Sequence, residues 1–427
     1  MLPAATADQI IADLVKPFSS AAQAETVPLQ QAAGRILAEA IAGAQDIPQW
    51  DNSAMDGYAV RYADVQSASE ATPQLLQVVE TIPAGYRPQR AIATGEAARI
   101  FTGGMVPEGA DTIVIQENVI QENTATPEAS AEAAPTELNR VAVLAAEPSA
   151  FIRRQGAFYQ AGQPLLAAGT LLGAPDIAVL ATAQCSAVPV YRQPRVAILS
   201  TGNELVTPDQ PLQPGQIVDS NQYALSALVA AAGAVPLPLG IVPDDPAQLK
   251  RTIAQALQQA DVVLSTGGVS VGDYDYVDRI LAELGAKIHV RAVAVKPGKP
   301  LTVATAGDQG SKLYFGLPGN PVSSLVGFWR FVQPALRKLS GRSGGWGPTF
   351  LPAIAQEELR AGGQRETYLW GRLTVTAEGY GFHLAAGSHS SGNLVNLSQT
   401  NALARVSQGE TRVAAGQLVS VLKVGEI

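Results

Sequence analysis

The stretch Asp261-Val-Val-Leu-Ser-Thr-Gly-Gly-Val-Ser-Val-Gly-Asp-Tyr-Asp275 decides the fold that this sequence predicts. Its first six residues are typical of a buried strand, a Gly-Gly turn follows, and a helix is expected over 276–284. The same order recurs on both sides of it. Further strands are expected at 195–200, 235–242, 288–295 and 313–317, and further helices at 220–232, 246–260 and 321–339. Apolar strands that alternate with helices indicate a mostly parallel, doubly wound sheet covered on both faces.

The segments outside this α/β region have other patterns. Alanine-rich stretches at 6–24 and 27–42 predict helices. Strands separated by Gly and Pro are expected at 75–80, 98–101, 112–116 and 140–144. Residues 121–139 have almost no large apolar side chain and indicate a mobile hairpin tip. A Gly-rich linker at 340–348 precedes short strands over 349–427, which indicate a small β-domain. The predicted fold class is therefore multidomain α/β plus β.

Composition excludes several classes of function. The 427 residues carry a formal net charge of −8, which argues against broad binding to nucleic acid or to an anionic membrane. With one cysteine and three histidines, a Cys/His zinc site is improbable, and a bound metal would be a hard cation held by carboxylates. The sequence has neither the basic start of a signal peptide nor an apolar run of about 20 residues. A cytoplasmic protein is expected.

Polar turns gather where the expected strands end. Ligands of open α/β sheets bind beyond the carboxyl ends of the strands, where Ser200-Thr-Gly-Asn-Glu204 and Gly316-Leu-Pro-Gly-Asn-Pro-Val-Ser-Ser324 should lie. Together with Lys296-Pro-Gly-Lys-Pro300, these turns offer the N–H groups, hydroxyls and cations that hold a phosphate. None matches the two common nucleotide fingerprints. A less usual phosphate-bearing ligand is therefore predicted.

Carboxylates accompany this predicted phosphate site. Glu204, Asp244 and Asp275 would repel a bare anion, so a bound Mg²⁺ is expected, since it prefers one or two carboxylates plus substrate phosphates. Simpler readings exist for each feature alone. Gly-Gly turns after strands are usually only turns, Asp245 is better explained as a helix cap, and the two lysines could be solvated. Their occurrence together favours the site.

The second group of polar residues is Asp51-Asn-Ser-Ala-Met-Asp-Gly-Tyr-Ala59. It combines two acids, an amide, a hydroxyl and a glycine, with no helix or strand pattern that requires them. The alternative is an Asx-type turn stabilised by its own side chains. The hydroxyl in Phe101-Thr-Gly-Gly104 is a weaker signal of the same kind.

The block Asp51–Ala59 resembles the hallmark of the molybdopterin molybdenumtransferases, the family of bacterial MoeA and the gephyrin E-domain. The other turns agree with this family and occur in the same order over nearly the whole chain. The resemblance implies a mixed helical N-terminal domain at 1–43 with 152–187, an inserted β-domain at 44–151, a molybdopterin-binding α/β domain at 188–340 and a C-terminal β-barrel at 347–427.

The resemblance also implies an activity. Adenylylated molybdopterin would be hydrolysed and molybdate inserted into its dithiolene, with Mg²⁺, giving molybdenum cofactor and AMP. A homodimer with each active site shared between chains is expected, and the molybdopterin adenylyltransferase is a candidate partner. The implied catalytic residues are Asp56, Thr102, Glu204, Asp244 and Asp275, with Glu204 and Asp275 on the metal. The implied substrate-binding residues are Ser200, Thr201, Gly267, Gly268, Ser270, Lys296, Lys299, Pro318, Asn320, Pro321 and Ser323.

Three positions depart from the family pattern. Phe158 replaces a frequent aspartate, Ala292 a lysine and Trp370 an arginine. Two cations and one acid are therefore missing from the expected site, which motivates a second hypothesis, a non-catalytic molybdopterin-binding scaffold of the same fold. A molybdopterin adenylyltransferase is a third hypothesis, but it would resemble the α/β domain alone.

Overall fold

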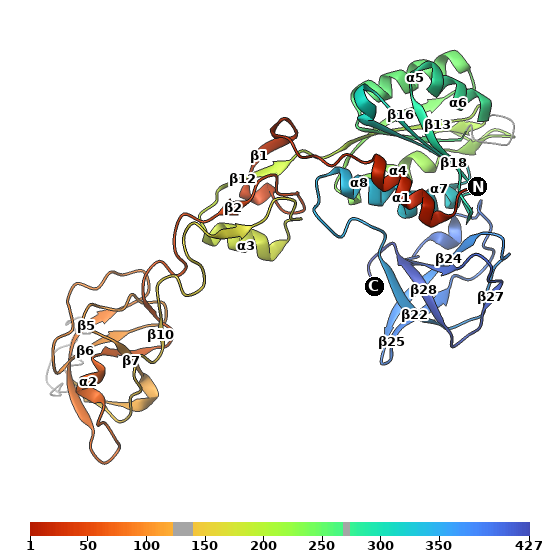
Figure 1. The fold of residues 1–427 in the computed structure, drawn as a ribbon. Coiled ribbons are helices and arrows are strands. Elements are labelled where there is room, and N and C mark those ends of the chain that lie inside the picture. Colours follow the sequence, from red (N-terminus) through yellow and green to blue (C-terminus); the bar gives the residue numbers. More distant parts are fainter. Residues whose placement is uncertain (123–139, 268–273) are drawn as a thin grey trace. The chain divides into compact units, whose positions relative to one another are not determined.

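The computed structural model describes residues 1–122, 140–267 and 274–427. They form two compact units, one of residues 1–39, 167–177 and 187–427 and the other of residues 40–166 and 178–186 (Figure 1). Most of the expected hairpin tip at 121–139 lies outside the described residues. The division into four domains stays a prediction. In the described part of the chain, no helix has the length and apolar character needed to cross a membrane.

The first unit contains the expected α/β sheet. Its strand order is β16-β13-β17-β21-β20-β18. The first four strands run parallel, whereas β20 is antiparallel to both of its neighbours. The pattern of mostly parallel strands is confirmed, with an antiparallel edge in addition. The strands are β13 (Arg195–Thr201), β16 (Val235–Val242), β17 (Val262–Thr266), β18 (Lys287–Ala292), β20 (Pro300–Ala306) and β21 (Lys312–Leu317).

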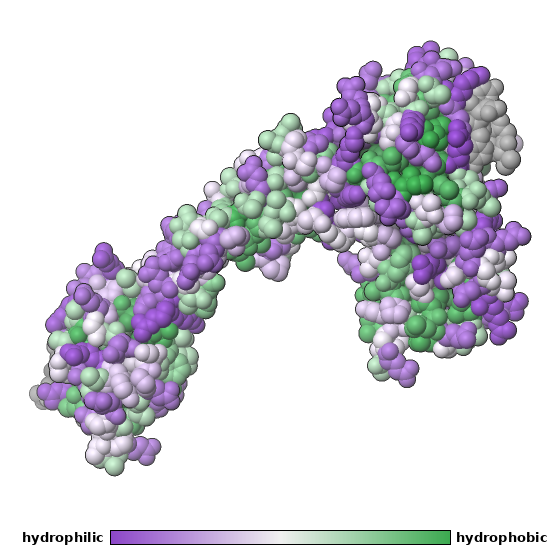
Figure 2. Space-filling view, in the orientation of Figure 1, coloured by the Kyte–Doolittle hydropathy of each residue, from purple (hydrophilic) through white to green (hydrophobic). Residues whose placement is uncertain are grey.

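Helices cover both faces of this sheet (Figure 1). On one face α5 (Pro246–Gln259) and α6 (Tyr274–Glu283) bury their apolar sides against the sheet, and Figure 2 shows many hydrophilic residues around their outer surface. On the other face lie α1, α4, α7 and α8. Asp245 caps α5 as expected, since its carboxylate accepts a hydrogen bond from Gln248 N at 2.7 Å. The remaining helices are α1 (Ala4–Leu14), α4 (Asn221–Ala231), α7 (Pro321–Gly327) and α8 (Gln333–Leu339).

A closed barrel follows the linker, as the resemblance implies. The strands run in the order β24-β25-β22-β28-β26, and β26 pairs back to β24. Tyr368 and Trp370 of β24 belong to the same buried cluster as the helices under the α/β sheet, so barrel and sheet share a core. The strands are β22 (Phe350–Ala355), β24 (Glu366–Thr376), β25 (Gly379–Leu384), β26 (Ala402–Val406) and β28 (Leu418–Lys423).

The short strand β19 (Val295–Lys296) joins the two sheets. It pairs with β24 of the barrel, while the chain continues through a turn into β20 of the α/β sheet. The segment before it is also fixed, because Leu2 N donates to Ala292 O at 2.9 Å and Leu2 O accepts from Ala294 N at 2.7 Å. The turn that follows β19 is therefore held by β24 of the barrel, by β20 of the α/β sheet and by the N-terminal segment at Leu2.

The prediction of helices at 6–24 and 27–42 is largely wrong. Only α1 forms, and it ends before Pro17, whose ring cannot continue a helix. Residues 24–28 form β1 (Ala24–Pro28), which pairs antiparallel with β12 (Ala187–Tyr191) and buries Val27. Within 27–42 the only helical turn is Leu29–Gln31. Tertiary pairing thus overrides the helix propensity of the alanines.

The second unit is built on a six-stranded sheet with the order β7-β4-β6-β5-β9-β8. Its strands include the four that the sequence predicts. The short pair β3 (Asn52–Ser53) and β10 (Ile152–Arg153) lies beside it. The sheet strands are β4 (Gly57–Val60), β5 (Gln74–Ile82), β6 (Glu96–Ile100), β7 (Thr112–Ile115), β8 (Val119–Glu122) and β9 (Arg140–Val143).

The shorter elements complete the description. Further strand pairs are β2 (Ile41–Ala42) with β11 (Pro164–Leu166), β14 (Leu205–Val206) with β15 (Ile217–Val218), and β23 (Leu359–Arg360) with β27 (Arg412–Val413). The helices α2 (Tyr62–Val65) and α3 (Ala174–Thr182) are short.

Candidate active site

The ends of β13, β17 and β21 meet closely because glycines follow them. Gly267 has a φ of +85°, and a Cβ atom there would lie 2.2 Å from Thr201 O. A Cβ on Gly319 would lie 3.4 Å from the Gly267 Cα. A side chain at Gly267 would collide with the neighbouring strand end, so this turn requires glycine. Gly268 and Ser270 lie outside the described residues.

The hydroxyls at these strand ends hold the sheet together. Thr266 Oγ1 donates to Ser200 Oγ at 3.1 Å, and Thr201 Oγ1 donates to Thr266 O at 3.4 Å. Ser200 and Thr201 are both buried. They therefore brace two strands at the edge of the site, and their contact with substrate stays a prediction.

The acids that follow the strands differ in their bonding. Glu204 is exposed, and its carboxylate folds back over Gly202. A Cβ atom on Gly202 would lie 2.6 Å from Glu204 Oε1. Asp244 is also exposed, but it is tied to the neighbouring loop: Asn203 N donates to its carboxylate at 3.3 Å, and Asp244 N donates to Asn203 Oδ1 at 3.1 Å. Glu204 is thus the freer of the two carboxylates.

The described residues offer few ligands for a metal ion. Among the described residues, no three His, Cys, Asp or Glu side chains come together as a metal site. Asp275 belongs to the first turn of α6, and its side chain lies outside the described part. The exposed oxygens of Glu204 fit the site that Mg²⁺ prefers, one or two carboxylates completed by substrate phosphates.

A basic pocket lies beside the turn after β19. Its volume is about 490 Å³, and no acid is among its lining residues. Lys296 and Lys299 come from the turn, and Gly298 between them packs on α7, where its Cβ position is 3.4 Å from Ser323 O. Ser323 is a further lining residue. The barrel supplies the rest of the wall: Arg360, Arg365, Thr367, Tyr368, Leu369, Trp370, His389, Ser390 and Ser391.

The start of α7 is fixed against this wall. Asn320 Nδ2 donates to Ser391 Oγ at 3.2 Å, and Val322 N donates to Ser391 O at 3.2 Å. Pro321 takes the first helical position, which needs no N–H donor. Pro318 is buried just before the turn. The residues of this turn that the sequence singles out therefore lie beside the barrel loop that carries Ser391.

His389 and Trp370 form the apolar part of the pocket wall. Their rings lie 4.2 Å apart, and His389 Nε2 is 2.9 Å from Ala385 O. Burial lowers the pKa of His389 against the opposing effect of that contact. The ring is therefore neutral, with its proton on Nε2, and the buried Nδ1 is an acceptor without a partner among the described residues.

The pocket changes the meaning of two departures from the family pattern. Trp370 is part of its wall, while Arg360 and Arg365 supply cations nearby. Arg372, two residues after Trp370, lies outside the lining. Near Ala292, Arg291 forms an ion pair with Asp278 at 2.7 Å and does not line the pocket. The lysines therefore do not act alone, and the barrel provides the additional charge.

Sequence reasoning misses the contribution of the barrel. Arg360, Arg365, His389, Ser390 and Ser391 are absent from the predicted site. The run Ser388-His-Ser-Ser391 carries the signal that could have revealed part of it, since small hydroxyl residues beside a histidine have no role in a strand pattern. The arginines carry no such signal.

The second unit holds the other predicted pair. Asp56 Oδ1 accepts hydrogen bonds from Thr102 N and Thr102 Oγ1, both at 2.7 Å. These two bonds lower the pKa of Asp56. Asp51 differs, because its carboxylate is held by Gln155 N at 2.7 Å and Arg154 Nη1 at 2.6 Å. Of the two acids in this block, Asp51 stabilises the local fold and Asp56 remains exposed beside Thr102.

Phe158, the third departure, also belongs to the second unit. Its side chain is 70% exposed, so it does not fill a core position. Nothing else in the described structure explains a phenylalanine there.

Comparisons with known proteins agree over the whole chain. Residues 2–183 match the family described as MoeA N-terminal region (domain I and II), 197–338 the probable molybdopterin binding domain, and 352–424 the MoeA C-terminal region (domain IV). A molybdopterin molybdenumtransferase of Nostoc sp. is 55% identical over 97% of this chain and 92% of its own. The one of Haemophilus influenzae is 34% identical over 97% and 98%. The solved molybdopterin biosynthesis moeA protein of Pyrococcus horikoshii OT3 superposes with a TM-score of 0.81 at 28% identity, over 99% of this chain and 100% of that one.

Proposed function

The chain belongs to the molybdopterin molybdenumtransferase family, and we propose that it inserts molybdate into adenylylated molybdopterin, releasing molybdenum cofactor and AMP. The observation that carries this proposal is the pocket of about 490 Å³ lined by four cationic side chains and no acid. It opens where loops from the α/β sheet and the barrel meet. A substrate that is itself a doubly charged oxyanion requires such a pocket.

Molybdate binds in the basic pocket. Lys296 and Lys299 provide compact positive charges, and Arg365 provides a planar group that can donate two parallel hydrogen bonds. The Ser391 and Ser323 hydroxyls lie in the same wall and can donate to further oxygens. The neutral His389 adds no charge to the pocket.

The adenylyl phosphate binds at the strand ends beside this pocket. Gly267 and Gly319 leave the backbone open there, so a phosphate can approach N–H groups directly. Glu204 and Asp275 are the proposed Mg²⁺ ligands, and the ion would neutralise charge on the phosphates when bound. Glu204, as the freer carboxylate, can accept a proton from the attacking water. Asp244 holds the Asn203 loop in place.

We further propose a homodimer in which Asp56 and Thr102 of one chain serve the site of the other. The support is the family resemblance, together with an Asp56 carboxylate that is ionised and exposed. Mixing Asp56→Ala chains with Lys299→Gln chains tests it, at a molybdate concentration too low for the Lys299→Gln site to turn over. Mixed dimers regain activity because one of their two sites has both residues. Absence of any recovery after demonstrated subunit exchange would contradict the shared site.

The non-catalytic scaffold is the weaker alternative. The relatives that match the chain over nearly its whole length are named as transferases, and Arg360 and Arg365 supply cations that the departures at Ala292 and Trp370 take away. The adenylyltransferase alternative does not account for the matches outside the α/β domain. A cytoplasmic location remains a prediction.

The decisive assay supplies purified protein with adenylylated molybdopterin, Mg²⁺ and molybdate and measures AMP release. Lys299→Gln should raise the molybdate concentration for half-maximal rate about tenfold or more, since a hydrogen bond to a charged group contributes about 1.5–3 kcal/mol. Lys250→Gln is the matched control, because Lys250 pairs with Glu283 on the exposed surface of α5. Tight molybdopterin binding without AMP release would support the scaffold instead.

A further inference from the structure

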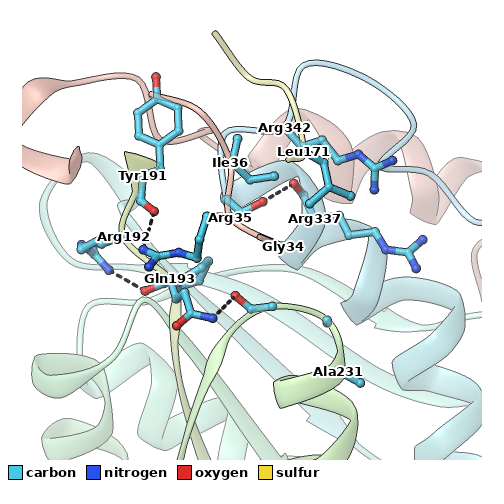
Figure 3. Close-up of a pocket in the computed structure, with 14 residues that line it drawn as sticks. Gly34, Arg35, Ile36, Leu171, Tyr191, Arg192, Gln193, Ala231, Arg337 and Arg342 are labelled. Atoms are coloured by element: carbon cyan, nitrogen blue, oxygen red, sulfur yellow. Dashed lines mark hydrogen bonds between the residues drawn. The ribbon is translucent and has the colours of Figure 1, made fainter. Parts of the chain in front are cut away.

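A second basic pocket lies at the end of the α/β sheet that is opposite the candidate active site (Figure 3). Its volume is about 290 Å³. Pro194 directly precedes β13, and Gly233 lies two residues before β16, so the pocket is at the amino ends of the parallel strands. The candidate active site is at their carboxyl ends. The two pockets are therefore separate sites.

The positive charge of this pocket is compensated only in part. Four arginines line the pocket, and no acid is among the lining residues. Arg192 is neutralised from outside the lining by Asp261, through bonds of 2.7 and 2.8 Å, and Arg35 by Glu25. For the guanidinium groups of Arg337 and Arg342 the described structure contains no ion pair or hydrogen bond. These two groups carry the positive charge that remains.

The two unpaired arginines extend on the same side of the pocket (Figure 3). Burial, and then the charge of Arg342, lower the pKa of Arg337. The charge of Arg342 therefore raises the free energy of the charged form of Arg337, and an anion placed between the two groups would relieve this repulsion. In addition, Arg35 Nε is buried and has no hydrogen-bond partner among the described groups.

The backbone holds these arginines in place before any ligand arrives. Arg337 lies in the last turn of α8, where Ser340 Oγ donates to its carbonyl at 2.8 Å. Arg342 follows Gly341, whose φ is +86° and whose Cβ position is 2.4 Å from the Tyr191 ring. On its other side, Ser343 N donates to Gly169 O at 3.0 Å. Binding therefore does not require the backbone at these two positions to become ordered.

We propose that this second pocket binds a small organic phosphate, with the phosphate group at Arg337 and Arg342. Guanidinium groups match phosphate oxygens with paired, charge-assisted hydrogen bonds. The cavity is several times larger than a phosphate ion needs and is close to the lower limit of about 300 Å³ for small-molecule sites. Ile36, Leu171 and Tyr191 provide apolar surface for the organic part.

The test uses phenyl phosphate as the probe, with phenol as the uncharged control. Because phenyl phosphate could also enter the first basic pocket, calorimetric titration is done on the Lys296→Gln/Lys299→Gln protein. Binding of phenyl phosphate and not of phenol is expected. Adding Arg337→Gln and Arg342→Gln should weaken it at least about tenfold, which corresponds to about 1.4 kcal/mol. Unchanged affinity after this addition would overturn the proposal.

The unfolding midpoint of the Arg337→Gln/Arg342→Gln variant, measured without ligand, separates a phosphate-binding role of the two arginines from a structural one. Removing two like charges that repel each other should leave the unfolding midpoint unchanged or higher, whereas loss of a structural contact would lower it. If the double variant does not fold, Arg342→Gln alone is titrated, since Arg342 lies in the linker. Lost dimerisation with unchanged phosphate binding would instead assign the arginines to contact between copies, and overturn the proposal.

Discussion

The guanidinium of Arg330 supports the most specific stability prediction. It is 3% exposed and donates to the two carboxylate oxygens of Asp8 at 2.5 Å each, and its Nε donates to the Tyr368 hydroxyl at 2.7 Å. The Tyr368 hydroxyl in turn donates to Glu366 at 2.6 Å. This network links α1, the helical segment Phe328–Val332 between α7 and α8, and strand β24 of the barrel. Burial opposes the charge, but these partners raise the pKa of Arg330 overall.

Asp8→Ala leaves that charge buried with only part of its compensation. Removing one partner of a fully buried pair costs about 3–5 kcal/mol. The Asp8 side chain is 35% exposed, so water screens the pair in part, and Glu366 lies 3.9 Å from Arg330. We therefore expect a loss of about 2–3 kcal/mol in the free energy of unfolding.

Urea unfolding followed by tryptophan fluorescence measures this loss, since Trp329 is adjacent to Arg330 and buried. Arg330→Met and the double variant complete a thermodynamic cycle. The coupling between the two residues should exceed about 1.5 kcal/mol, well above the additivity error of about 0.5 kcal/mol. The exposed pair Lys250 and Glu283, at 2.7 Å, is the control and should couple by less than about 1 kcal/mol. Equal coupling in both pairs would refute the reasoning.

Three further predictions concern single groups. Thr102→Val removes one of the two bonds that lower the pKa of Asp56, so that pKa should rise toward the ordinary aspartate value of 3.8. A carbon-13 NMR titration of the carboxyl group measures it, and no rise would contradict the hydrogen bond. Gly267→Ala should lower the free energy of unfolding by more than about 2 kcal/mol, because the added Cβ atom would collide with the Thr201 carbonyl oxygen. Gly285→Ala is the control: Gly285 has a φ of +73° but open space around it, so the change should cost about 1 kcal/mol. Equal costs would show that the contact between Gly267 and Thr201 is unimportant. The pKa of Asp261 is lowered, because bonds from Arg192 and the Arg195 N–H outweigh the effect of burial. Its stabilising contribution is thus present above pH 3.8 and is lost as pH falls through the lowered pKa; Asp261→Asn should flatten the pH dependence of unfolding in that acid range, and an unchanged slope would exclude this carboxylate as its source.

The α/β sheet is predictable from sequence because its parallel strands are buried on both faces and alternate with capped helices. Strand β20 is not predicted from the sequence, because it begins at Pro300, the last residue of the turn Lys296–Pro300, and the whole segment resembles one extended turn. The helix expected at 27–42 fails for a different reason. Alanine gives a helix signal from its own propensity, but Val27 finds its buried partner, Val188, about 160 residues further along the chain.

The candidate site is predictable only in part, for reasons of distance along the chain. Lys296, Lys299 and Ser323 belong to turns with distinctive composition, so sequence finds them. Arg365 and His389 acquire a role only when the barrel closes through the pairing of β24 with β26. Nothing in a single arginine between two strands indicates which cavity it will face.

The anchoring of the turn after β19 has a practical consequence for anyone preparing this protein. Leu2 is hydrogen-bonded on both sides, to Ala292 and Ala294, and the chain reaches Lys296 only two residues later. An affinity tag fused ahead of residue 1 would begin one residue away from the hydrogen bonds of Leu2 that hold this scaffold. A tag after Ile427, which is 43% exposed, leaves that scaffold alone. Anion affinities measured on the two preparations should differ, and the tag placed at Ile427 is the one to use for every assay of the pocket.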